Sequence, residues 1–316
     1  MVLAAGLGTR LRPLTYEMPK PMVPVLNRPI MEHILELLKR HGFEDVVANL
    51  SYLPDQVRER FGDGSAHGVS LEWSFEEELL GTAGGVREVR DFFGGEPFLV
   101  MAADALTDID LGALWEAHRS NDGIATLSVK RVPDTSEYGV VIAGADGRIQ
   151  GFQEKPDPAE ALSDLASCMI YVFEPEIFDY FPDQHEVDFA TDVFPVLLEN
   201  DVPFHVHEID AYWNDVGSLD EYLQGNLDAL LGAVHVAQPR EATRLDDRSA
   251  GTPPVLLGPG CEIGDDVRLE GPLVIGDGCR IGAGAAIKES VLIPGAEVPA
   301  STVLARAIVA TRGSGG

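Results

Sequence analysis

The chain opens with Leu3-Ala4-Ala5-Gly6-Leu7-Gly8-Thr9-Arg10-Leu11-Arg12-Pro13, an apolar run that leads into a turn with two glycines and two arginines. Glycines let backbone N–H groups come close to an anion, and arginines neutralise its charge. A second element, Pro19-Lys20-Pro21-Met22, places a lysine ten residues after Arg10. Together the two elements predict a phosphate-binding loop at the end of a short strand.

This loop differs from the two best-known phosphate loops. The pattern G-x-x-x-x-G-K-[ST] of a Walker loop is absent from the sequence. The dinucleotide fingerprint needs a third glycine where Leu11 stands. A glycine turn with a purely structural role is the alternative, and the flanking cations argue against it.

Five further elements follow in order: residues 80–85 (LGTAGG), 103–108 (ADALTD), 138–140 (YGV), 152–156 (FQEKP) and 212–217 (YWNDVG). With the opening loop they resemble the signature of the sugar-1-phosphate nucleotidyltransferases. Within that family the sequence is most similar to mannose-1-phosphate guanylyltransferases that carry a C-terminal repeat region. The resemblance covers residues 3–217.

The resemblance implies an attack by a sugar phosphate on the α-phosphorus of a nucleoside triphosphate (NTP), with pyrophosphate leaving in line. The nucleophile is already an anion, so catalysis needs alignment and charge neutralisation and no general base. Carboxylates that hold Mg²⁺ and cations that hold phosphates are the expected groups.

The roles implied by the resemblance fall on these motifs. Arg10 would bind the departing phosphates, Lys20 the α-phosphate and Lys155 the sugar phosphate. Asp104 and Asp215 would hold one Mg²⁺. Nucleotide contacts are expected at Leu3, Ala5, Gly6, Gly8, Thr9, Glu76, Gly81 and Thr82, and sugar contacts at Gly139, Glu154, Lys155 and Ser167.

Glu76 carries the prediction about the base. Relatives that use uridine or thymidine nucleotides often have glutamine five residues before the glycine that corresponds to Gly81, and this chain has a carboxylate there. A carboxylate only accepts hydrogen bonds, and guanine offers two adjacent donors. GTP is therefore favoured, although Glu77 and Glu78 blur the register. An exposed acidic strand end is the structural alternative.

Two departures from the family pattern bear on the sugar. Relatives usually have glycine where Ala103 stands, and one methyl group fits there if φ is negative. Relatives also read Asn-x-Gly where this chain has Ser167-Cys168-Met169. This change predicts a sugar pocket that is reshaped or partly filled.

The alternation of apolar segments predicts the fold of residues 1–232. Strands are expected at 2–5, 45–50, 70–75 and 98–102, alternating with helices at 30–41, 55–61 and 84–91. Such alternation is typical of a parallel, doubly wound sheet with its ligand crevice at the carboxyl ends of the strands. The later part, with strands at 125–131, 139–142, 169–173 and 204–208, makes the expected fold a Rossmann-like mixed sheet.

A polar stretch makes 233–252 an expected linker, and then the period changes. Apolar residues recur every six positions from Val255 to Val309, and a second series starts at Leu257. This hexapeptide repeat predicts a parallel β-helix of about three coils over 253–312, with 313–316 as a tail. Family likeness implies the left-handed form. Glu297 interrupts the series and is expected to cap it.

Composition limits the partners. There are 52 acidic and 23 basic residues, giving a net charge of −29, which argues against nucleic-acid and anionic-membrane partners. Widely spaced Cys168, Cys261 and Cys279 predict reduced, mostly buried thiols in a cytoplasmic protein. No signal peptide or membrane span is predicted. The β-helix predicts a homo-oligomer.

Three classes of function remain open. The leading one is an Mg²⁺-dependent enzyme that makes a GDP-sugar from mannose 1-phosphate or an analogue. A glucose-1-phosphate uridylyl- or thymidylyltransferase is the alternative within the class. A regulatory homologue that binds a nucleotide sugar without turnover, and an assembly module, are the non-enzymatic alternatives.

Overall fold

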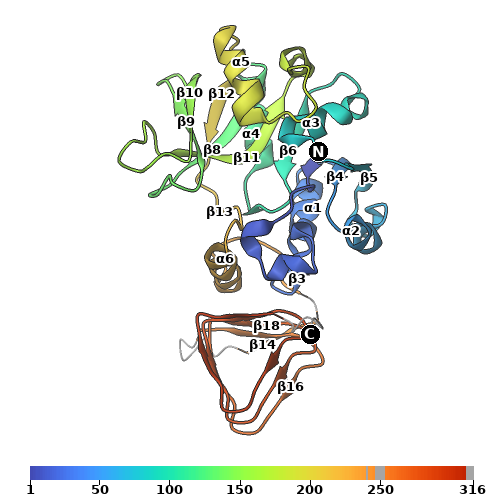
Figure 1. Cartoon of the computed structure of the whole chain (residues 1–316), viewed down its shortest axis with the longest axis vertical. Helices are drawn as coiled ribbons and strands as arrows, with labels where there is room; N and C mark the ends of the chain where they lie inside the picture. Colours follow the sequence, from blue (N-terminus) through green and yellow to red (C-terminus); the bar gives the residue numbers. More distant parts are fainter. Residues whose placement is uncertain (240, 246–252, 311–316) are drawn as a thin grey trace. The chain divides into compact units, whose positions relative to one another are not determined.

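The computed structural model describes residues 1–239, 241–245 and 253–310. By its internal contacts the chain divides into two compact units, described one at a time below (Figure 1). The first unit comprises Met1–Gly6, Leu35–Ala105 and Ile109–Trp213. The second comprises Leu7–Ile34, Leu106–Asp108 and Asn214–Gly316, so the boundary between the units crosses the opening loop.

The helices lie close to their predicted positions. Their bounds are α1 Ile30–Arg40, α2 Pro54–Phe61, α3 Gly81–Glu88, α4 Leu111–Arg119, α5 Phe194–Glu199 and α6 Leu219–Leu231. Local sequence sets several ends: Asp110 caps α4 by accepting from the Ala113 N–H, and Ser218 caps α6 in the same way. α3 begins at Gly81, three residues before the predicted start at 84.

A mixed sheet forms the centre of the first unit. Its strands are β1 Val2–Leu3, β4 Asp45–Leu50, β5 Ser70–Phe75, β6 Phe98–Ala102, β8 Ala125–Arg131, β9 Gly139–Ala143, β10 Ile149–Glu154, β11 Leu165–Phe173 and β12 His205–Glu208. The order is β10-β9-β11-β6-β1-β4-β5, with β8 between β11 and β12. Strands β6, β1, β4 and β5 are parallel, which confirms the Rossmann-like mixed sheet.

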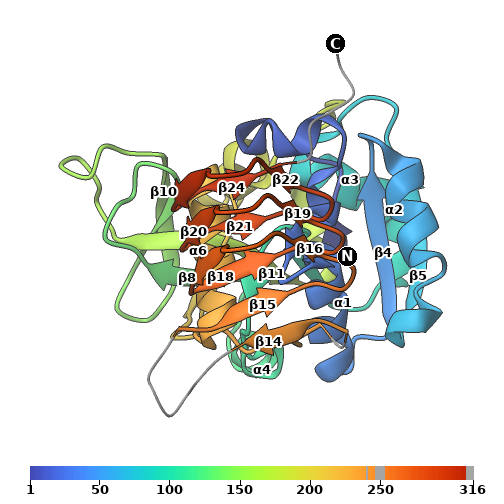
Figure 2. The same cartoon turned by 90° about the horizontal axis from the view of Figure 1, so that it is seen from below.

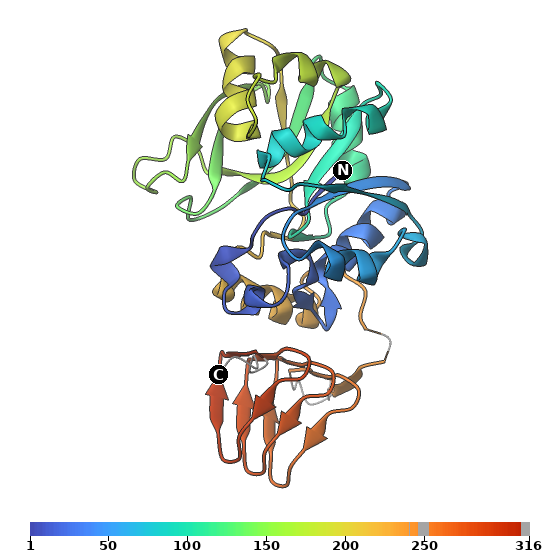
Figure 3. The same ribbon diagram turned by 45° about the vertical axis from the view of Figure 1, so that its right-hand side comes forward.

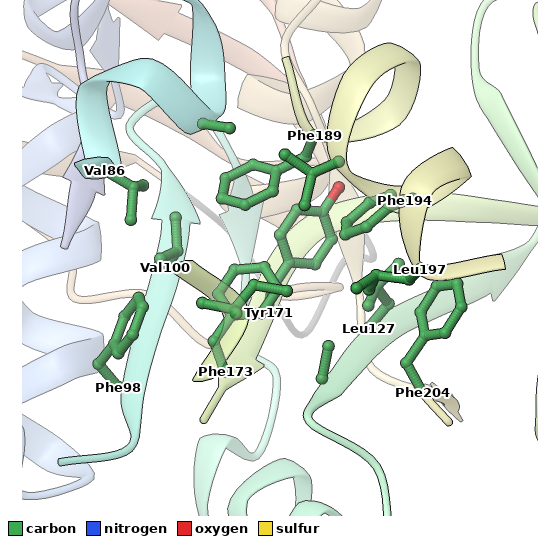
Figure 4. Close-up of a cluster of buried hydrophobic side chains, with 14 of the residues drawn as sticks. Val86, Phe98, Val100, Leu127, Tyr171, Phe173, Phe189, Phe194, Leu197 and Phe204 are labelled. Carbon is green, nitrogen blue, oxygen red and sulfur yellow. The ribbon is translucent and has the colours of Figure 1, made fainter. Parts of the chain in front are cut away.

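An aromatic cluster fills one side of this sheet (Figure 4). Phe173 on β11 stacks on Phe189 at 4.9 Å between ring centroids, and Tyr171 meets Phe189 and Phe194 edge to face. Phe189 belongs to η7, a π-helix over Phe189–Val193. Offset and edge-to-face pairs of this kind stabilise a core beyond the area they bury. The cluster therefore fixes η7 against β11.

Strand β11 contains an irregularity in the middle. Its pairing with β8 shifts register between Ser167 and Tyr171. Within that stretch Met169 has φ +56°, in the left-handed region that favours glycine. The position at which relatives carry glycine is thus one where the backbone calls for it.

In the second unit, residues 24–29 form a short hairpin, β2 Pro24–Val25 and β3 Arg28–Pro29. The hairpin is fixed to α6, because the Tyr222 hydroxyl donates to the Pro24 carbonyl and the Leu26 N–H donates to the Asn226 side chain. The remaining short strands are β7 Leu106–Thr107 and β13 Trp213–Asn214.

The C-terminal part of the second unit is the predicted β-helix. Its short strands are β14 Thr243–Leu245, β15 Val255–Leu257, β16 Glu262–Ile263, β17 Arg268–Glu270, β18 Leu273–Ile275, β19 Arg280–Ile281, β20 Ala286–Lys288, β21 Val291–Leu292, β22 Glu297–Val298, β23 Val303–Ala305 and β24 Ile308–Val309. In the described part of the chain they form the sheets β14-β15-β18-β21-β24, β16-β19-β22 and β17-β20-β23. Each coil is a triangle in outline, and strands of successive coils lie side by side (Figures 1, 2 and 3). The left-handed form stays a prediction.

The repeat changes length within the β-helix. Arg268 pairs with Ala286, 18 residues on, whereas Ala286 pairs with Val303, 17 residues on. The missing residue falls between β20 and β21. The strict count of six therefore slips, and Val303, expected inward, is 78% exposed while Val298 is buried. The prediction that Glu297 caps the series is wrong, because β22 continues the coil through it.

Two boundary predictions differ from the structure in part. Within the predicted linker 233–252, Thr243–Leu245 forms β14, which pairs antiparallel with β15. Residues 246–252 of that linker and the predicted tail 313–316 lie outside the described residues. The cysteines are free thiols, with Cys168 and Cys279 buried and Cys261 half-buried, as expected. None of the helices in the described residues is both long and apolar enough to span a bilayer.

Candidate functional site

The opening loop of the second unit folds back on itself. Gly8 has φ +61° and precedes a 3₁₀ helix over Thr9–Leu11. The Thr15 hydroxyl donates to the Gly8 carbonyl at 2.7 Å, and a Cβ at Gly8 would lie 3.1 Å from the Lys20 Cβ. The glycine is therefore needed both for its backbone angle and for the close approach of Lys20.

This fold brings the predicted cations to Asp215. Arg10 Nη2 lies 4.0 Å from Asp215 Oδ2, and Lys20 Nζ donates to the Asp215 backbone carbonyl at 3.4 Å. The Arg10 side chain is 50% exposed and that of Asp215 is 24% exposed. Two cations and one carboxylate that are far apart in sequence thus share one region of the second unit, open to a charged ligand.

The turn that carries Asp215 is strained and closely packed. The Val216 N–H donates to the Asn214 side chain at 2.7 Å, and Val216 has φ +43°, which a β-branched residue rarely adopts. A Cβ at Gly217 would lie 2.8 Å from Asp215 Oδ2. The glycine in the motif therefore leaves room for the Asp215 carboxylate.

In the first unit, Glu76 lies inside a hydrogen-bonded chain. The Ala4 N–H donates to Asn49 Oδ1, and Asn49 Nδ2 donates to Glu76 Oε1, each at 2.7 Å. The Leu80 N–H donates to Glu76 Oε2 at 3.1 Å. Glu76 is only 3% exposed. The expected exposed acidic strand end is wrong for Glu76, and contact with the base stays a prediction.

This chain of donors and acceptors makes a sharp prediction for Glu76→Gln. Both oxygens of Glu76 accept from N–H groups, so a glutamine amide would turn a donor toward Asn49 or Leu80. We expect unfolding free energy to fall by about 1–3 kcal/mol, the usual result of a buried mismatched polar pair. Urea unfolding measures the change. Glu77→Gln, an exposed neighbour, is the control, and equal midpoints for the two variants would contradict the prediction.

Residues 80–84, called here the 80–84 turn, pack against another segment of the first unit. Gly81 has φ +77°, and a Cβ there would collide with the Val187 backbone, 2.8 Å from its carbonyl carbon. The Ala83 and Gly84 N–H groups both donate to the Val187 carbonyl at 2.9 Å. The predicted nucleotide residues Gly81 and Thr82 thus stand in a turn whose backbone is held from one side.

Asp104 follows the parallel strand β6, where the carboxyl end of a strand presents side chains to ligands. The preceding Ala103 N–H donates to the Leu3 carbonyl at 2.9 Å, so Asp104 is tied to the end of β1. Ala103 is buried and is not among the residues with positive φ, so its methyl group is accommodated as expected. Leu3 is half-buried, Ala5 is buried, and Gly6 is exposed.

A cavity of about 440 Å³ in the first unit contains three of the predicted sugar residues. We call it the Ser167 cavity. Its lining includes Gly139, Glu154 and Ser167 on one side and Ala190 and Thr191 on the other. A Cβ at Gly139 would lie 3.3 Å from Glu154 Oε2, so glycine leaves space for that carboxylate. Pockets of this size with a few polar groups commonly bind small molecules.

Lys155 stands beside this cavity without lining it. It has φ +44°, and its Nζ lies 3.9 Å from Glu154 Oε1 on an exposed surface. The Ser167 hydroxyl shares a 2.8 Å hydrogen bond with the Tyr171 hydroxyl, which also donates to Met169 Sδ at 3.1 Å. Burial raises the pKa of Tyr171, so its hydroxyl stays protonated. Met169 is held by Tyr171 and is not part of the lining, so the cavity beside Ser167 remains open.

The left-handed backbone at Met169 predicts an inverted order of stability. Met169→Gly and Met169→Ala lose the same packing apart from one methyl group, but alanine keeps a Cβ that crowds the backbone at this φ. We expect the glycine variant to be more stable by about 1 kcal/mol, measured by urea unfolding. Val172, in the same strand, is the control site, where alanine should be the more stable of the two. Equal order at both sites would contradict the strain.

The residues present fit Mg²⁺ by their chemistry. Magnesium prefers carboxylate oxygens and commonly takes one or two from the protein, with phosphates and water completing its shell. Asp104 and Asp215 are the matching carboxylates, both half-buried. Within the described residues no group of three or more His, Cys, Asp or Glu side chains is placed to hold a metal. A site completed by substrate phosphates does not need such a group.

Sequence reasoning missed several residues that the structure places at these sites. Asn49 bridges Ala4 and Glu76, and Asp188 accepts from the Thr82 hydroxyl at 2.8 Å. Thr191 lines the Ser167 cavity. Asp188 stands before an apolar helical run in the manner of a helix cap, and this was the one signal that could have drawn attention to it.

Comparisons with known proteins agree with this geometry. A family model described as nucleotidyl transferase matches residues 1–231. A second model, bacterial transferase hexapeptide (six repeats), matches residues 254–289. The second match ends at the turn where the coil loses one residue.

Curated relatives match nearly the whole chain. A UTP–glucose-1-phosphate uridylyltransferase of Synechocystis is 37% identical over 99% of this chain and 89% of its own length. A mannose-1-phosphate guanylyltransferase of Mycobacterium tuberculosis is 35% identical over 86% of this chain and 78% of its own length.

Solved structures share the fold of the first part. A glucose-1-phosphate thymidylyltransferase from Bacillus anthracis, solved with sucrose and titled putative, has a TM-score of 0.64 at 24% identity, covering 71% of this chain and 92% of its own. HddC from Yersinia pseudotuberculosis with GMP-PN has a TM-score of 0.61 at 24% identity, covering 71% and 96%.

Proposed function

Since the chain belongs to the nucleotidyl transferase family and is a sugar-1-phosphate nucleotidyltransferase, we propose that it transfers a guanylyl group from GTP to mannose 1-phosphate with Mg²⁺. The observation that carries the proposal is the placement of Arg10 and Lys20 at Asp215. Charge neutralisation at phosphates is what the reaction requires.

The chain's residues divide the work by charge. Arg10 and Lys20 hold the triphosphate, and Lys155 holds the phosphate of the sugar, so that the attacking oxygen and the α-phosphorus are aligned. Asp104 and Asp215 are the proposed Mg²⁺ ligands, and the bound ion would neutralise charge on the phosphates. The sugar ring occupies the Ser167 cavity, where Glu154 accepts from its hydroxyls.

The choice of GTP and mannose 1-phosphate is supported by the curated guanylyltransferase relatives and by the acceptor-only carboxylate of Glu76. A second candidate is uridylyl transfer to glucose 1-phosphate. It is favoured by the Synechocystis relative that covers 99% of this chain and by the engagement of both Glu76 oxygens within the protein.

The test is pyrophosphate release with Mg²⁺, crossing GTP, UTP, dTTP and ATP against mannose, glucose and N-acetylglucosamine 1-phosphates. Preference for GTP with mannose 1-phosphate supports the proposal, and preference for UTP with glucose 1-phosphate replaces it with the second candidate. Binding of a nucleotide sugar with no turnover for any pair would overturn both and leave a regulatory role.

We also propose that the β-helix makes the chain a homo-oligomer. Ile263, 41% exposed, and Val303, 78% exposed, are apolar groups on its surface. Light scattering during size exclusion measures the mass. Ile263→Lys combined with Val303→Lys should lower it, and a wild-type monomer would contradict the proposal. Cytoplasmic location stays a prediction.

A further inference from the structure

The 80–84 turn is joined to a second segment of the first unit by side chains as well as backbone. The Thr82 hydroxyl donates to Asp188 Oδ2 at 2.8 Å and accepts from the Phe189 N–H at 3.0 Å. The Val187 N–H donates to the Leu80 carbonyl at 2.8 Å. Arg87 adds bonds from α3 to the Pro182, Gln184 and His185 carbonyls. The two segments form one hydrogen-bonded body.

Asp188 connects that body to the wall of the Ser167 cavity. Its Oδ1 accepts from the Ala190 N–H at 2.9 Å, and it caps η7. Ala190 and Thr191 of η7 line the cavity opposite Glu154 and Ser167. One carboxylate therefore has one oxygen bound to the predicted nucleotide residue Thr82 and the other bound to the sugar wall.

Close packing leaves the connection little slack. A Cβ at Gly81 would collide with the Val187 backbone, so the turn and the segment before η7 move together or not at all. Phe189 is buried against Tyr171, whose hydroxyl bonds Ser167 (Figure 4). A π-helical turn differs from an α-helical one by one bond per residue, and such turns are frequent at functional sites.

We propose that Asp188 is a positioning residue that couples the 80–84 turn to the Ser167 cavity, so that bound nucleotide strengthens the binding of sugar 1-phosphate. The inference rests on the proposed function for the identity of the ligands. Nucleotide at Gly81 and Thr82 fixes the turn, the turn fixes Asp188, and Asp188 fixes Ala190 and Thr191. Coupling of this kind is reciprocal, so sugar 1-phosphate strengthens nucleotide binding by the same factor.

Calorimetric titration measures the coupling directly. Sugar 1-phosphate is titrated into the full chain alone and with a saturating α,β-methylene NTP analogue, which blocks transfer. The pair used is the one that turns over best. We expect nucleotide to tighten sugar 1-phosphate binding at least about 5-fold in the wild type. In Asp188→Asn the factor should fall to within about 2-fold of one, because the amide cannot accept from Thr82.

The variants are chosen to separate coupling from loss of structure. Asparagine caps helices as well as aspartate does, so Asp188→Asn keeps η7 capped. Asp110→Asn makes the same change at the cap of α4, away from this connection, and should keep full coupling. Thr82→Val should lose the coupling and Thr82→Ser should retain it. Combining Thr82→Val with Asp188→Asn should cause no further loss.

Three results would overturn the inference: no coupling in the wild type, full coupling in Asp188→Asn, or equal loss in Asp110→Asn. Turnover with no coupling contradicts this inference alone. Absence of both turnover and binding for every pair contradicts the proposed function and this inference with it.

Discussion

Asp104→Asn is expected to lower kcat for nucleotidyl transfer at least about 10³-fold, because it removes a charge from the proposed metal site while keeping the shape of the side chain. Asp104 is half-buried and follows β6, and the preceding Ala103 is bonded to Leu3. The fold should therefore survive, and the midpoint of urea unfolding should stay close to that of the wild type. Pyrophosphate release at saturating substrates measures the loss.

Asp108→Asn is the matched control. Asp108 stands in the same motif, and its Oδ2 accepts from the His235 N–H at 2.9 Å, a bond that asparagine can keep. Its turnover should stay within about 2-fold of the wild type, a difference of less than about 0.5 kcal/mol. Added Mg²⁺ should recover part of the activity of Asp104→Asn. A variant that retained a tenth of wild-type kcat would remove Asp104 from the reaction.

Gly81→Ala is expected to have the largest effect on stability. Alanine at φ +77° costs about 1–2 kcal/mol, and its Cβ would also meet the Val187 backbone, which has no flexible side chain to move. Overpacking of this kind adds about 1–3 kcal/mol. We expect unfolding free energy to fall by about 2–5 kcal/mol in total, measured by urea unfolding.

Gly42→Ala separates the two costs. Gly42 has φ +82°, and a Cβ there would meet nothing within 4 Å. Only the backbone cost applies, so the loss should be about 1–2 kcal/mol. If Gly81→Ala proved no less stable than Gly42→Ala, the close approach of the 80–84 turn to Val187 would play no part in stability.

The sequence predicted the positions where strands meet ligands because those positions depend on local patterns. Strands β4, β5 and β6 have the predicted bounds, since each is an apolar or alternating run between turns. Gly81 and Asp104 follow β5 and β6 at the carboxyl side, as a doubly wound sheet requires. The closeness of Arg10 and Lys20 to Asp215 was implied by family likeness, and no local pattern contains it.

The surroundings of Glu76 could not be predicted from sequence. Its partner Asn49 is 27 residues away, and its burial depends on how β4 and β5 pair. The acidic run 76–78 suggests exposure for all three positions, yet only Glu76 is buried. Whether an acidic side chain meets solvent or an internal donor is decided by tertiary packing, which composition does not contain.

The connection through Asp188 was invisible for a similar reason. Thr82 and Asp188 are 106 residues apart, and nothing in either local sequence indicates the other. The left-handed backbone at Met169 was visible only indirectly, as a departure from the glycine of relatives. Backbone angles of this kind follow from the shift in β11 pairing, which an apolar strand pattern does not reveal.

The short turn between Lys288 and Val291 ties the ancestry of the last coils to that of the turn. Side chains in a strand alternate between faces, so restoring one residue there would point Glu297 into the β-helix and Val298 out of it. A deletion in that turn is tolerated only in a chain whose later coils already have the shifted pattern. Turn and coils must therefore be inherited as one block, and a chimaera with a relative that keeps 18-residue coils throughout will fold only if its crossover lies before the turn.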